Sequence, residues 1–231
     1  MTKSSGTVLA GKRRPAGRGL PALLFCTAAL VPLALSGCGG LFHSNARPDQ
    51  VYYLRATALE KGSAAADPLA ASLRVIRPTA APGLDSPQIV LLQSDRRMSF
   101  YLASRWPASA PNMVESLAVE KLRGSGMWQS VGDSTSSFPS DYVIQIMIRR
   151  FEADYTSGGP APDIHVVFDC VVGRREGREV VASFLAEGSA QAGANRLGAV
   201  VAAFETATNT ALDSMARQTA GAVRLALASK R

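Results

Sequence analysis

Three polar side chains near residue 165 have the residue types of a metal site. Asp163, His165 and Asp169 stand at odd-numbered positions of "DIHVVFDCVV", a segment with strand composition. Alternate residues of a strand point to the same face, so all three share one face. Carboxylates and a histidine can bind a metal ion, but such ligands normally converge from several elements. A solvated strand face has the same composition, and we predict no metal ligand and no cofactor.

Two further carboxylates could form an acid/base pair. Glu152 and Asp154 share a face of the strand-like segment "DYVIQIMIRRFEADY", but no substrate cleft is marked around them, so solvated surface is the preferred interpretation. The chain has no G-x-S-x-G, no Gly-rich phosphate loop, no C-x-x-C and no H-E-x-x-H. The sequence therefore predicts no catalytic residue and a protein that is not an enzyme.

The N-terminal segment has the pattern of an export signal. Residues 1–19 carry five basic side chains and no acidic one, and Leu20 to Leu35 are apolar and uncharged. This run is shorter than the roughly 20 residues of a membrane-spanning helix and contains Pro21 and Pro32. Arg13-Arg14 would allow twin-arginine export, but Pro15-Ala16 follows where apolar residues are expected, so the general export route is preferred.

One cysteine has the setting of a lipidation site. Leu35-Ser36-Gly37-Cys38 resembles the lipobox of bacterial lipoproteins, where the thiol is alkylated with diacylglycerol before cleavage; a stray cysteine in an ordinary signal is the alternative. A multiply acylated Cys38 would stay in the membrane, since each buried methylene contributes about 0.8 kcal/mol. By resemblance, Gly39 implies sorting to the outer membrane. We predict a signal peptide at 1–37, a lipidated flexible tether at 38–48 and one domain at 49–231.

Charge and cysteine content limit the partners. Loss of residues 1–37 removes five of 25 basic residues and none of the 18 acidic ones, so the net charge falls from +7 to +2. No basic stripe with interleaved aromatic residues remains, and we predict no nucleic-acid partner. Cys26 leaves with the signal and Cys38 is acylated, which leaves Cys170 without a partner for an intrachain disulfide.

Hydrophobic periodicity predicts an α/β domain in which two main helices pack on a mixed sheet. Alternation and composition indicate strands at 51–56, 73–76 and 141–155, a hairpin of 89–92 with 98–102, and a second hairpin turning at Glu176-Gly177. Apolar residues on both faces of 143–151 favour a strand covered on both sides. Three- and four-residue spacing predicts helices at 111–123 and 197–223, the first capped by Ser109 and the second covering the sheet.

Aromatic residues gather in "MSFYLASRW" and "FEADY". Tryptophan, tyrosine and arginine concentrate binding energy at interfaces, so Arg105, Trp106, Phe151 and Tyr155 are candidate partner-binding residues. For Trp106, packing into the core at the entry of the helix is the alternative.

Four segments in order, "PGLDSPQIVLLQSDRRMSFYLASRW", "LRGSGMWQSV", "DYVIQIMIRRFEADY" and "AVVAAFETATNTAL", resemble the ABC-type transport auxiliary lipoproteins of the paraquat-inducible protein C type. The resemblance implies an anticodon-binding-domain-like fold and a non-enzymatic outer-membrane lipoprotein of an MCE-type system for lipids or other hydrophobic compounds. It also implies an MCE-domain partner, with a homo-oligomer as a further expectation. The last helix here ends without the aromatic residue that is usual in the family.

Two other functions fit a small lipoprotein of this kind. One is an outer-membrane plug of the lipopolysaccharide-assembly type, in which a helix also covers a sheet. The other is a lipid-anchored hydrolase, against which the missing nucleophile motif counts.

Overall fold

The computed structural model describes residues 48–59 and 68–229. Within them the order of elements is β1 (Gln50–Val51), β2 (Leu69–Val75), β3 (Thr79–Ala80), β4 (Gln88–Leu92), β5 (Met98–Arg105), α1 (Ala110–Gly124), β6 (Trp128–Gly132), β7 (Tyr142–Asp154), β8 (Asp163–Arg174), the 3₁₀ turn η2 (Glu176–Arg178), β9 (Glu179–Gln191) and α2 (Leu197–Ala228). The strands form one mixed sheet, which confirms the predicted α/β class with two main helices.

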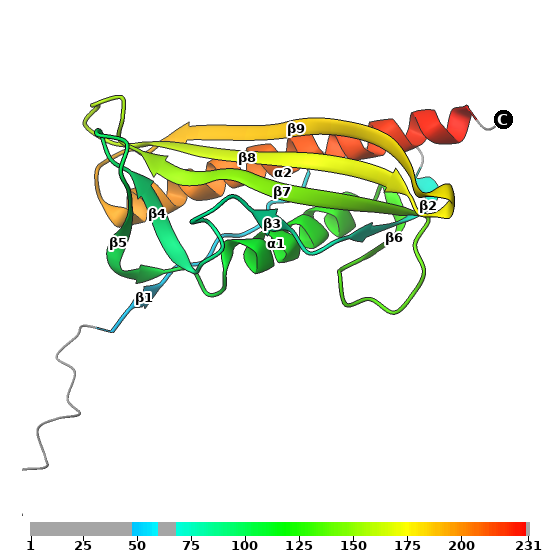
Figure 1. Ribbon diagram of the computed structural model, residues 1–231, viewed down its shortest axis with the longest axis horizontal. Coiled ribbons are helices and arrows are strands. Elements are labelled where there is room, and N and C mark those ends of the chain that lie inside the picture. The colour runs from blue at the N-terminus through cyan, green and yellow to red at the C-terminus, as the bar shows by residue number, and fades with distance from the viewer. Residues whose placement is uncertain (1–47, 60–67, 230–231) are drawn as a thin grey trace, which may run out of the picture. The chain divides into compact units, whose positions relative to one another are not determined.

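The long strand β7 organises the sheet. One edge of β7 pairs with β8, and β8 pairs in turn with β9; both pairings are antiparallel (Figure 1). Its other edge pairs in succession with β2, β3 and β4, all parallel to it. Beyond these, β5 lies antiparallel to β4, while β6 and β1 lie parallel to β2 and β5. The predicted hairpins of β4 with β5 and of β8 with β9 are confirmed.

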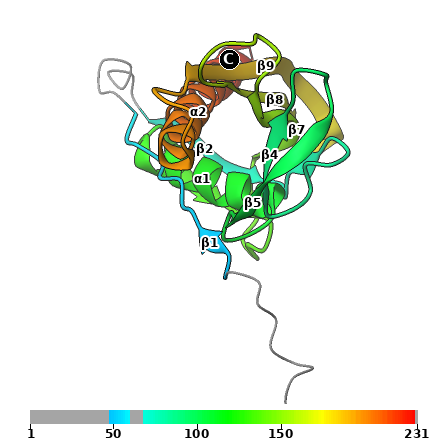
Figure 2. The same ribbon diagram turned by 90° about the vertical axis from the view of Figure 1, so that its left-hand side faces the viewer.

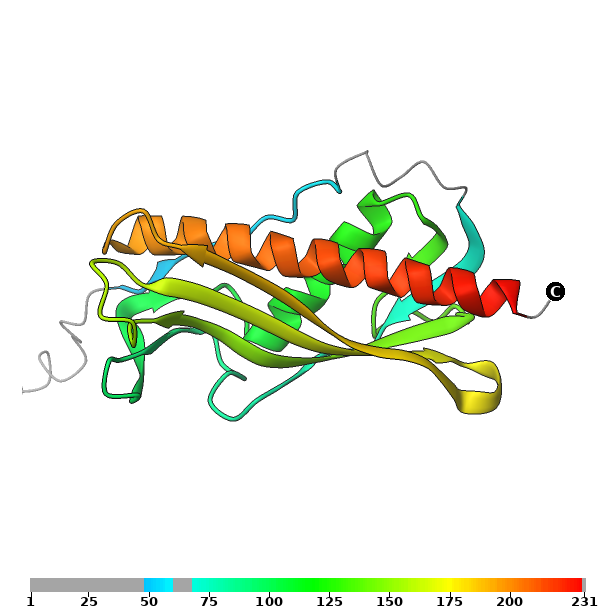
Figure 3. The ribbon, with the colours of Figure 1, turned by 90° about the horizontal axis from the view of Figure 1, so that it is seen from above.

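Helix α2 lies along β7, β8 and β9 and covers one face of them (Figure 3). Alternate residues of β8 point toward the helix and are fully buried: Ile164, Val166, Phe168, Cys170 and Val172. Close approach depends on Gly188 in β9, where a Cβ atom would lie only 2.0 Å from the carbonyl oxygen of Ala207 in α2. Seen end-on, both helices and the strands surround one core (Figure 2).

The two helices begin and end close to the predicted residues. Helix α1 follows Ser109 at its N-cap, although the Ser109 side chain makes no capping hydrogen bond. Helix α2 buries a stripe at three- and four-residue spacing that includes Val200, Phe204, Leu212 and Met215. Hydrophobic spacing was sufficient to predict both helices, because each helix buries one face and exposes the other.

The strand predicted at 51–56 is wrong beyond Val51. Beyond Tyr52, whose amide still bonds Arg105 of β5, the segment runs beside the helices, and polar side chains of α2 bond the backbone of Arg55 and Thr57. The Nδ2 group of Asn209 donates to the carbonyl oxygen of Arg55 at 2.8 Å, and its Oδ1 atom accepts from the amide of Thr57. The buried ammonium group of Lys121 pairs with Asp213 and lies 3.4 Å from the Thr57 hydroxyl.

The prediction that β7 is covered on both sides is also wrong. Ile144, Ile146 and Ile148 are buried, but Gln145 and Met147 between them are exposed. A β-bulge then changes the alternation, because the register passes from Ile148 opposite Phe168 directly to Arg150 opposite Val167. The next residue, Phe151, therefore points to the core side.

The predicted signal peptide, most of the predicted tether and residues 60–67 lie outside the described residues. Among the helices that the structure describes, none is long and apolar enough to cross a membrane.

Candidate functional site

The predicted partner-binding residues fall into a buried pair and an accessible pair. The side chains of Trp106 and Phe151 are only 1% and 2% exposed, so their predicted contact with a partner is wrong. Both pack against Phe204 of α2, with ring centroids 5.3 Å from it. For Trp106 the core alternative is therefore correct; for Phe151 the cause is the bulge in β7, which turns the ring inward.

Tyr155 lies just after β7 and joins three segments. Its hydroxyl donates to Oδ1 of Asn195 at 2.7 Å and accepts from the hydroxyl of Tyr101 in β5 at 2.9 Å. Burial and the hydrogen bond to Tyr155 raise the pKa of Tyr101 far above its ordinary value, so Tyr101 stays protonated. The half-buried Tyr155 ring is thus fixed between β5 and the connection to α2.

Arg105 ends β5 and remains accessible. Its guanidinium lies 3.6 Å from the carboxylate of Asp49, and 41% of its side chain is exposed. The neighbouring β1 pairs with β5 through Val51 opposite Arg105, so the chain enters the domain beside this arginine. Arg105 and Tyr155 are the two predicted binding residues whose polar groups a partner can reach.

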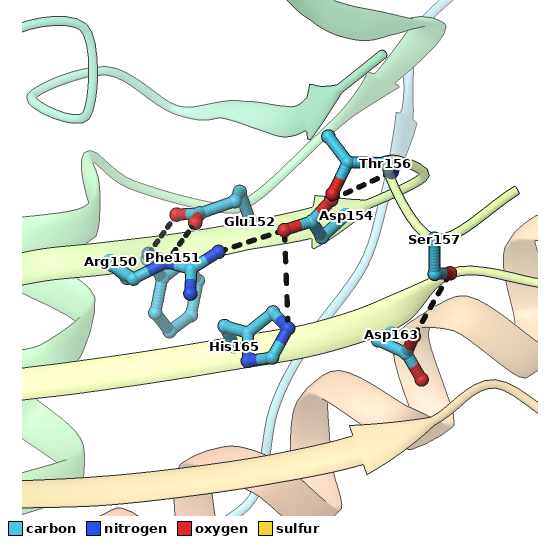
Figure 4. Close-up of polar contacts among 8 residues, drawn as sticks. All are labelled: Arg150, Phe151, Glu152, Asp154, Thr156, Ser157, Asp163 and His165. Atoms are coloured by element: carbon cyan, nitrogen blue, oxygen red, sulfur yellow. Dashed lines mark hydrogen bonds and ion pairs between the residues drawn. The ribbon is translucent and has the colours of Figure 1, made fainter. Parts of the chain in front are cut away.

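The carboxylates of Glu152 and Asp154 form part of a closed polar cluster on the outer side of β7 (Figure 4). Arg150 donates to Glu152 at 2.5 Å and to Asp154 at 2.9 Å, and both carboxylate residues are less than 10% exposed. Burial would raise the pKa of Asp154, but hydrogen bonds from Thr156 and Arg150 outweigh it and lower that pKa. The interpretation as solvated surface is wrong, because both carboxylates are fixed beside the Arg150 guanidinium.

The three residues weighed as metal ligands share the outer face of β8, as predicted, but they have separate partners. His165 faces Asp154 at 4.0 Å, Asp163 accepts from Ser157 at 3.2 Å, and Asp169 pairs with Arg149 (Figure 4 shows the first two). Within residues 48–59 and 68–229, no three His, Cys, Asp or Glu side chains are grouped so that they could hold a metal ion.

Sequence analysis missed a groove on the outer face of the sheet. It has a volume of about 360 Å³ and lies where β7 begins, β8 ends and η2 turns into β9. Its floor is apolar, with Val143, Val171 and Val180, while arginines of the turn line its edge. The sequence feature that could have indicated this groove is the combination of valines at alternate strand positions with three arginines within residues 174–178.

Comparison with solved structures finds the same fold elsewhere. A protein of Xanthomonas campestris assigned to the DUF330 family is 26% identical, with a TM-score of 0.67 over 76% of this chain and 98% of its own. An uncharacterized protein is 12% identical, with a TM-score of 0.56 over 74% of this chain and 99% of its own. A comparison with curated proteins finds no match.

Comparison with family sequence models identifies the chain more closely. One model, described as the ABC-type transport auxiliary lipoprotein component, matches residues 52–216. The match spans well over half of the chain and runs from the segment held by Asn209 to the middle of α2. The ordered motifs, the mixed sheet with its two helices and this match agree, and the chain therefore belongs to the ABC-type transport auxiliary lipoprotein family.

Proposed function

We propose that the protein is an outer-membrane lipoprotein of an MCE-type ABC system for lipids or other hydrophobic compounds, and that it acts by docking an MCE-domain protein. The observation that carries the proposal is the family match over residues 52–216. The Leu35–Cys38 motif supports anchoring by acyl chains, and Gly39 supports the outer membrane. A docking role requires no catalytic group, in keeping with the closed polar cluster around Arg150.

The tether limits where docking can occur. Ten peptide steps separate Cys38 from Pro48, and an extended chain spans at most about 3.5 Å per residue, or roughly 35 Å in all. The domain begins at β1, which pairs with the end of β5. An acylated Cys38 therefore keeps the β1–β5 end of the domain close to the bilayer, where a docked partner could deliver its cargo.

The docking surface that we propose consists of Arg105 and Tyr155. Both are accessible, and tyrosine and arginine are enriched among residues that contribute most to binding. The hydrogen bonds of Tyr155 to Tyr101 and Asn195 hold the ring in place before a partner arrives. Binding then costs little side-chain entropy, which favours a specific contact.

Crosslinking in cells tests this proposal. The tagged full-length chain would be recovered from envelope extracts after mild crosslinking, together with the variants Tyr155→Ala and Arg105→Ala. Phe138→Ala is the matched control, because Phe138 is an aromatic residue that is 80% exposed and precedes β7, whereas Tyr155 follows it. Thermal unfolding of each purified variant would show that the domain remains folded.

We expect the wild type and Phe138→Ala to recover an MCE-domain protein, and the Tyr155 and Arg105 variants to recover at least about tenfold less, the equivalent of 1.4 kcal/mol. Equal recovery with all variants would reject the proposed surface. Recovery of lipopolysaccharide-assembly proteins, with no MCE-domain protein, would reject the proposed function.

A further inference from the structure

The outer face of β7, β8 and β9 carries a strip rich in apolar side chains, interrupted by Gln145, Ser183 and Asp169, with no helix over it in the described part of the chain. Three successive rungs of the sheet contribute five outward-facing apolar side chains, and we name this set the outer strip: Val143, Met147, Val171, Val180 and Leu185. Val180, Leu185 and Met147 are 63%, 48% and 41% exposed. At about 3.3 Å per residue, the rungs from Gly173 to Asp169 extend over roughly 13 Å.

The groove of about 360 Å³ forms one end of the outer strip. Val143, Val171 and Val180 line it, together with Gln145 and Gly173. The volume is at the lower end of the range for small-molecule pockets. It can take the end of an acyl chain or a head group, but not a folded protein segment of several residues.

Basic side chains gather around this end of the strip. Arg174 is paired with Glu179 at 2.8 Å and lies over the ring of Tyr142, while its Nε atom is buried without a hydrogen-bond partner in the described structure. Arg175 and Arg178 also line the groove. Neither of them forms an ion pair with any residue of 48–59 or 68–229, so the groove has excess positive charge.

At the other end, the strip meets charges that are already neutralised. At this end, Asp169 of β8 stands between Met147 of β7 and Leu185 of β9, and its carboxylate pairs with Arg149. Farther along the same face, Arg150 is paired with Glu152 and Asp154. The outer face therefore has one cationic end with an apolar track leading from it, which is the polarity of an amphiphile with an anionic head.

We infer that the outer strip and its groove bind an anionic amphiphile, with the acyl chain along Val171, Met147 and Leu185 and the phosphate or carboxylate between Arg175 and Arg178. Guanidinium groups bind these oxyanions by charge-assisted hydrogen bonds, and burial of the strip by an acyl chain removes exposed apolar surface from water. The inference deepens the proposed transport function and rests on it, because it assigns the protein a binding site for lipid cargo.

Photocrosslinking of the full-length protein in cells tests the inference. Cells would be grown with a diazirine-bearing fatty acid, so that their phospholipids carry a photoreactive chain. After irradiation, the tagged protein is purified and digested, and mass spectrometry locates the adducts. Peptides that contain Val171 to Leu185 report on the strip and are distinct from the acylated peptide of Cys38; the adduct mass separates phospholipid from free fatty acid.

Two variants and one control define the site. Val171→Asp places a carboxylate in the groove floor, and Arg178→Asn removes a cation at a position with φ of 53°, which asparagine tolerates. Arg217→Gln removes an exposed arginine from α2 and serves as the control. Thermal unfolding verifies that each variant is folded, and Arg178→Asn remains informative if Val171→Asp unfolds.

We expect adducts on the strip peptides of the wild type and Arg217→Gln, reduced about tenfold in Val171→Asp and severalfold in Arg178→Asn. Strip peptides without adducts, or equal labelling in all four proteins, would overturn the inference. So would crosslinks from the strip to a second copy of the chain in place of lipid. If photocrosslinking shows no lipid on the strip, but the pull-down still recovers an MCE-domain protein in a manner that depends on Tyr155, the lipid site is rejected and the docking proposal stands.

Discussion

The Oδ1 atom of Asn209 accepts two hydrogen bonds from Thr57, one from its amide nitrogen at 2.7 Å and one from its hydroxyl at 2.9 Å. The Nδ2 group of the same side chain donates to the carbonyl oxygen of Arg55 at 2.8 Å. A side-chain amide presents the same donor and acceptor as a peptide group, so Asn209 replaces the neighbouring strand that residues 52–59 lack.

Replacement of Asn209 by alanine should lower the free energy of unfolding by about 2 kcal/mol, because it leaves the Thr57 amide and the Arg55 carbonyl without partners. Urea unfolding followed by circular dichroism measures the change. Thr210→Ala is the control, since its hydroxyl bonds only the preceding helical turn and is exposed. An unfolding free energy of Asn209→Ala as high as that of Thr210→Ala would contradict a stabilising role for the Asn209 hydrogen bonds.

Gly188→Ala should separate helix α2 from the sheet. The added Cβ atom would lie 2.0 Å from the Ala207 carbonyl oxygen and 2.8 Å from the Ala211 amide, and backbone atoms of a helix cannot move individually. Overpacking of this kind costs about 1 to 3 kcal/mol, and we expect a loss at the upper end of that range.

Gly198→Ala provides the comparison for Gly188→Ala. A Cβ atom at Gly198 meets nothing within 4 Å, and this residue lies in the first turn of α2. The free energy of unfolding of Gly198→Ala should be unchanged or raised by up to about 1 kcal/mol, because alanine favours a helix more than glycine does. Equal thermal midpoints for the two variants would contradict direct contact between α2 and β9.

The stability of the folded chain should fall at alkaline pH through Cys170. Burial raises the pKa of this thiol from 9.0 to about 12, so between these values the unfolded thiol loses its proton while the folded thiol retains it. The unfolded state then binds fewer protons, and the free energy of unfolding decreases by up to about 1.4 kcal/mol per pH unit above pH 9. Below pH 9 the contribution is constant.

Chemical denaturation of the wild type and Cys170→Ala at several values between pH 8 and 10.5 measures this dependence. The difference between the two curves isolates the contribution of Cys170 from that of every other ionisable group. Parallel curves would mean that the thiol ionises equally in both states.

Cys38→Ala should leave an uncleaved or wrongly processed precursor that does not fractionate with outer membranes, because alkylation requires a thiol. Metabolic labelling with an acyl-chain analogue measures the modification, and Cys170→Ala is the matched control. Label retained by Cys38→Ala and lost from Cys170→Ala would refute lipidation at the predicted site.

The regular elements were predictable where one periodicity ran through the whole segment. Helix α2 keeps its three- and four-residue spacing from Val200 to Val223, and β8 alternates without interruption from Asp163 to Val172. The four ordered motifs were sufficient to recognise the family, which the match to residues 52–216 confirms.

The site was less predictable because it depends on local breaks in these periods. The bulge after Ile148 is not marked by a glycine or proline, and it reverses the direction of Phe151. Trp106 is buried because the ring of Phe204, a residue far along the chain, lies against it. The segment at 52–59 has strand composition, but beyond Tyr52 its backbone bonds side chains of α2, with Asn209 bonding Arg55 and Thr57 and Glu205 accepting from the Arg55 amide.

The central strand β7 also determines the order in which the molecule can assemble. Strands β2, β3 and β4 come before β7 in the chain, yet each of them pairs with it in parallel. During synthesis, which proceeds from the N-terminus, β2 can pair only with β6 and β4 only with β5 until residues 142–154 are present, because β7 alone joins these two groups of strands. Because such long-range pairing is slow, the first half of the chain is open to chaperones and proteases until the second half has emerged.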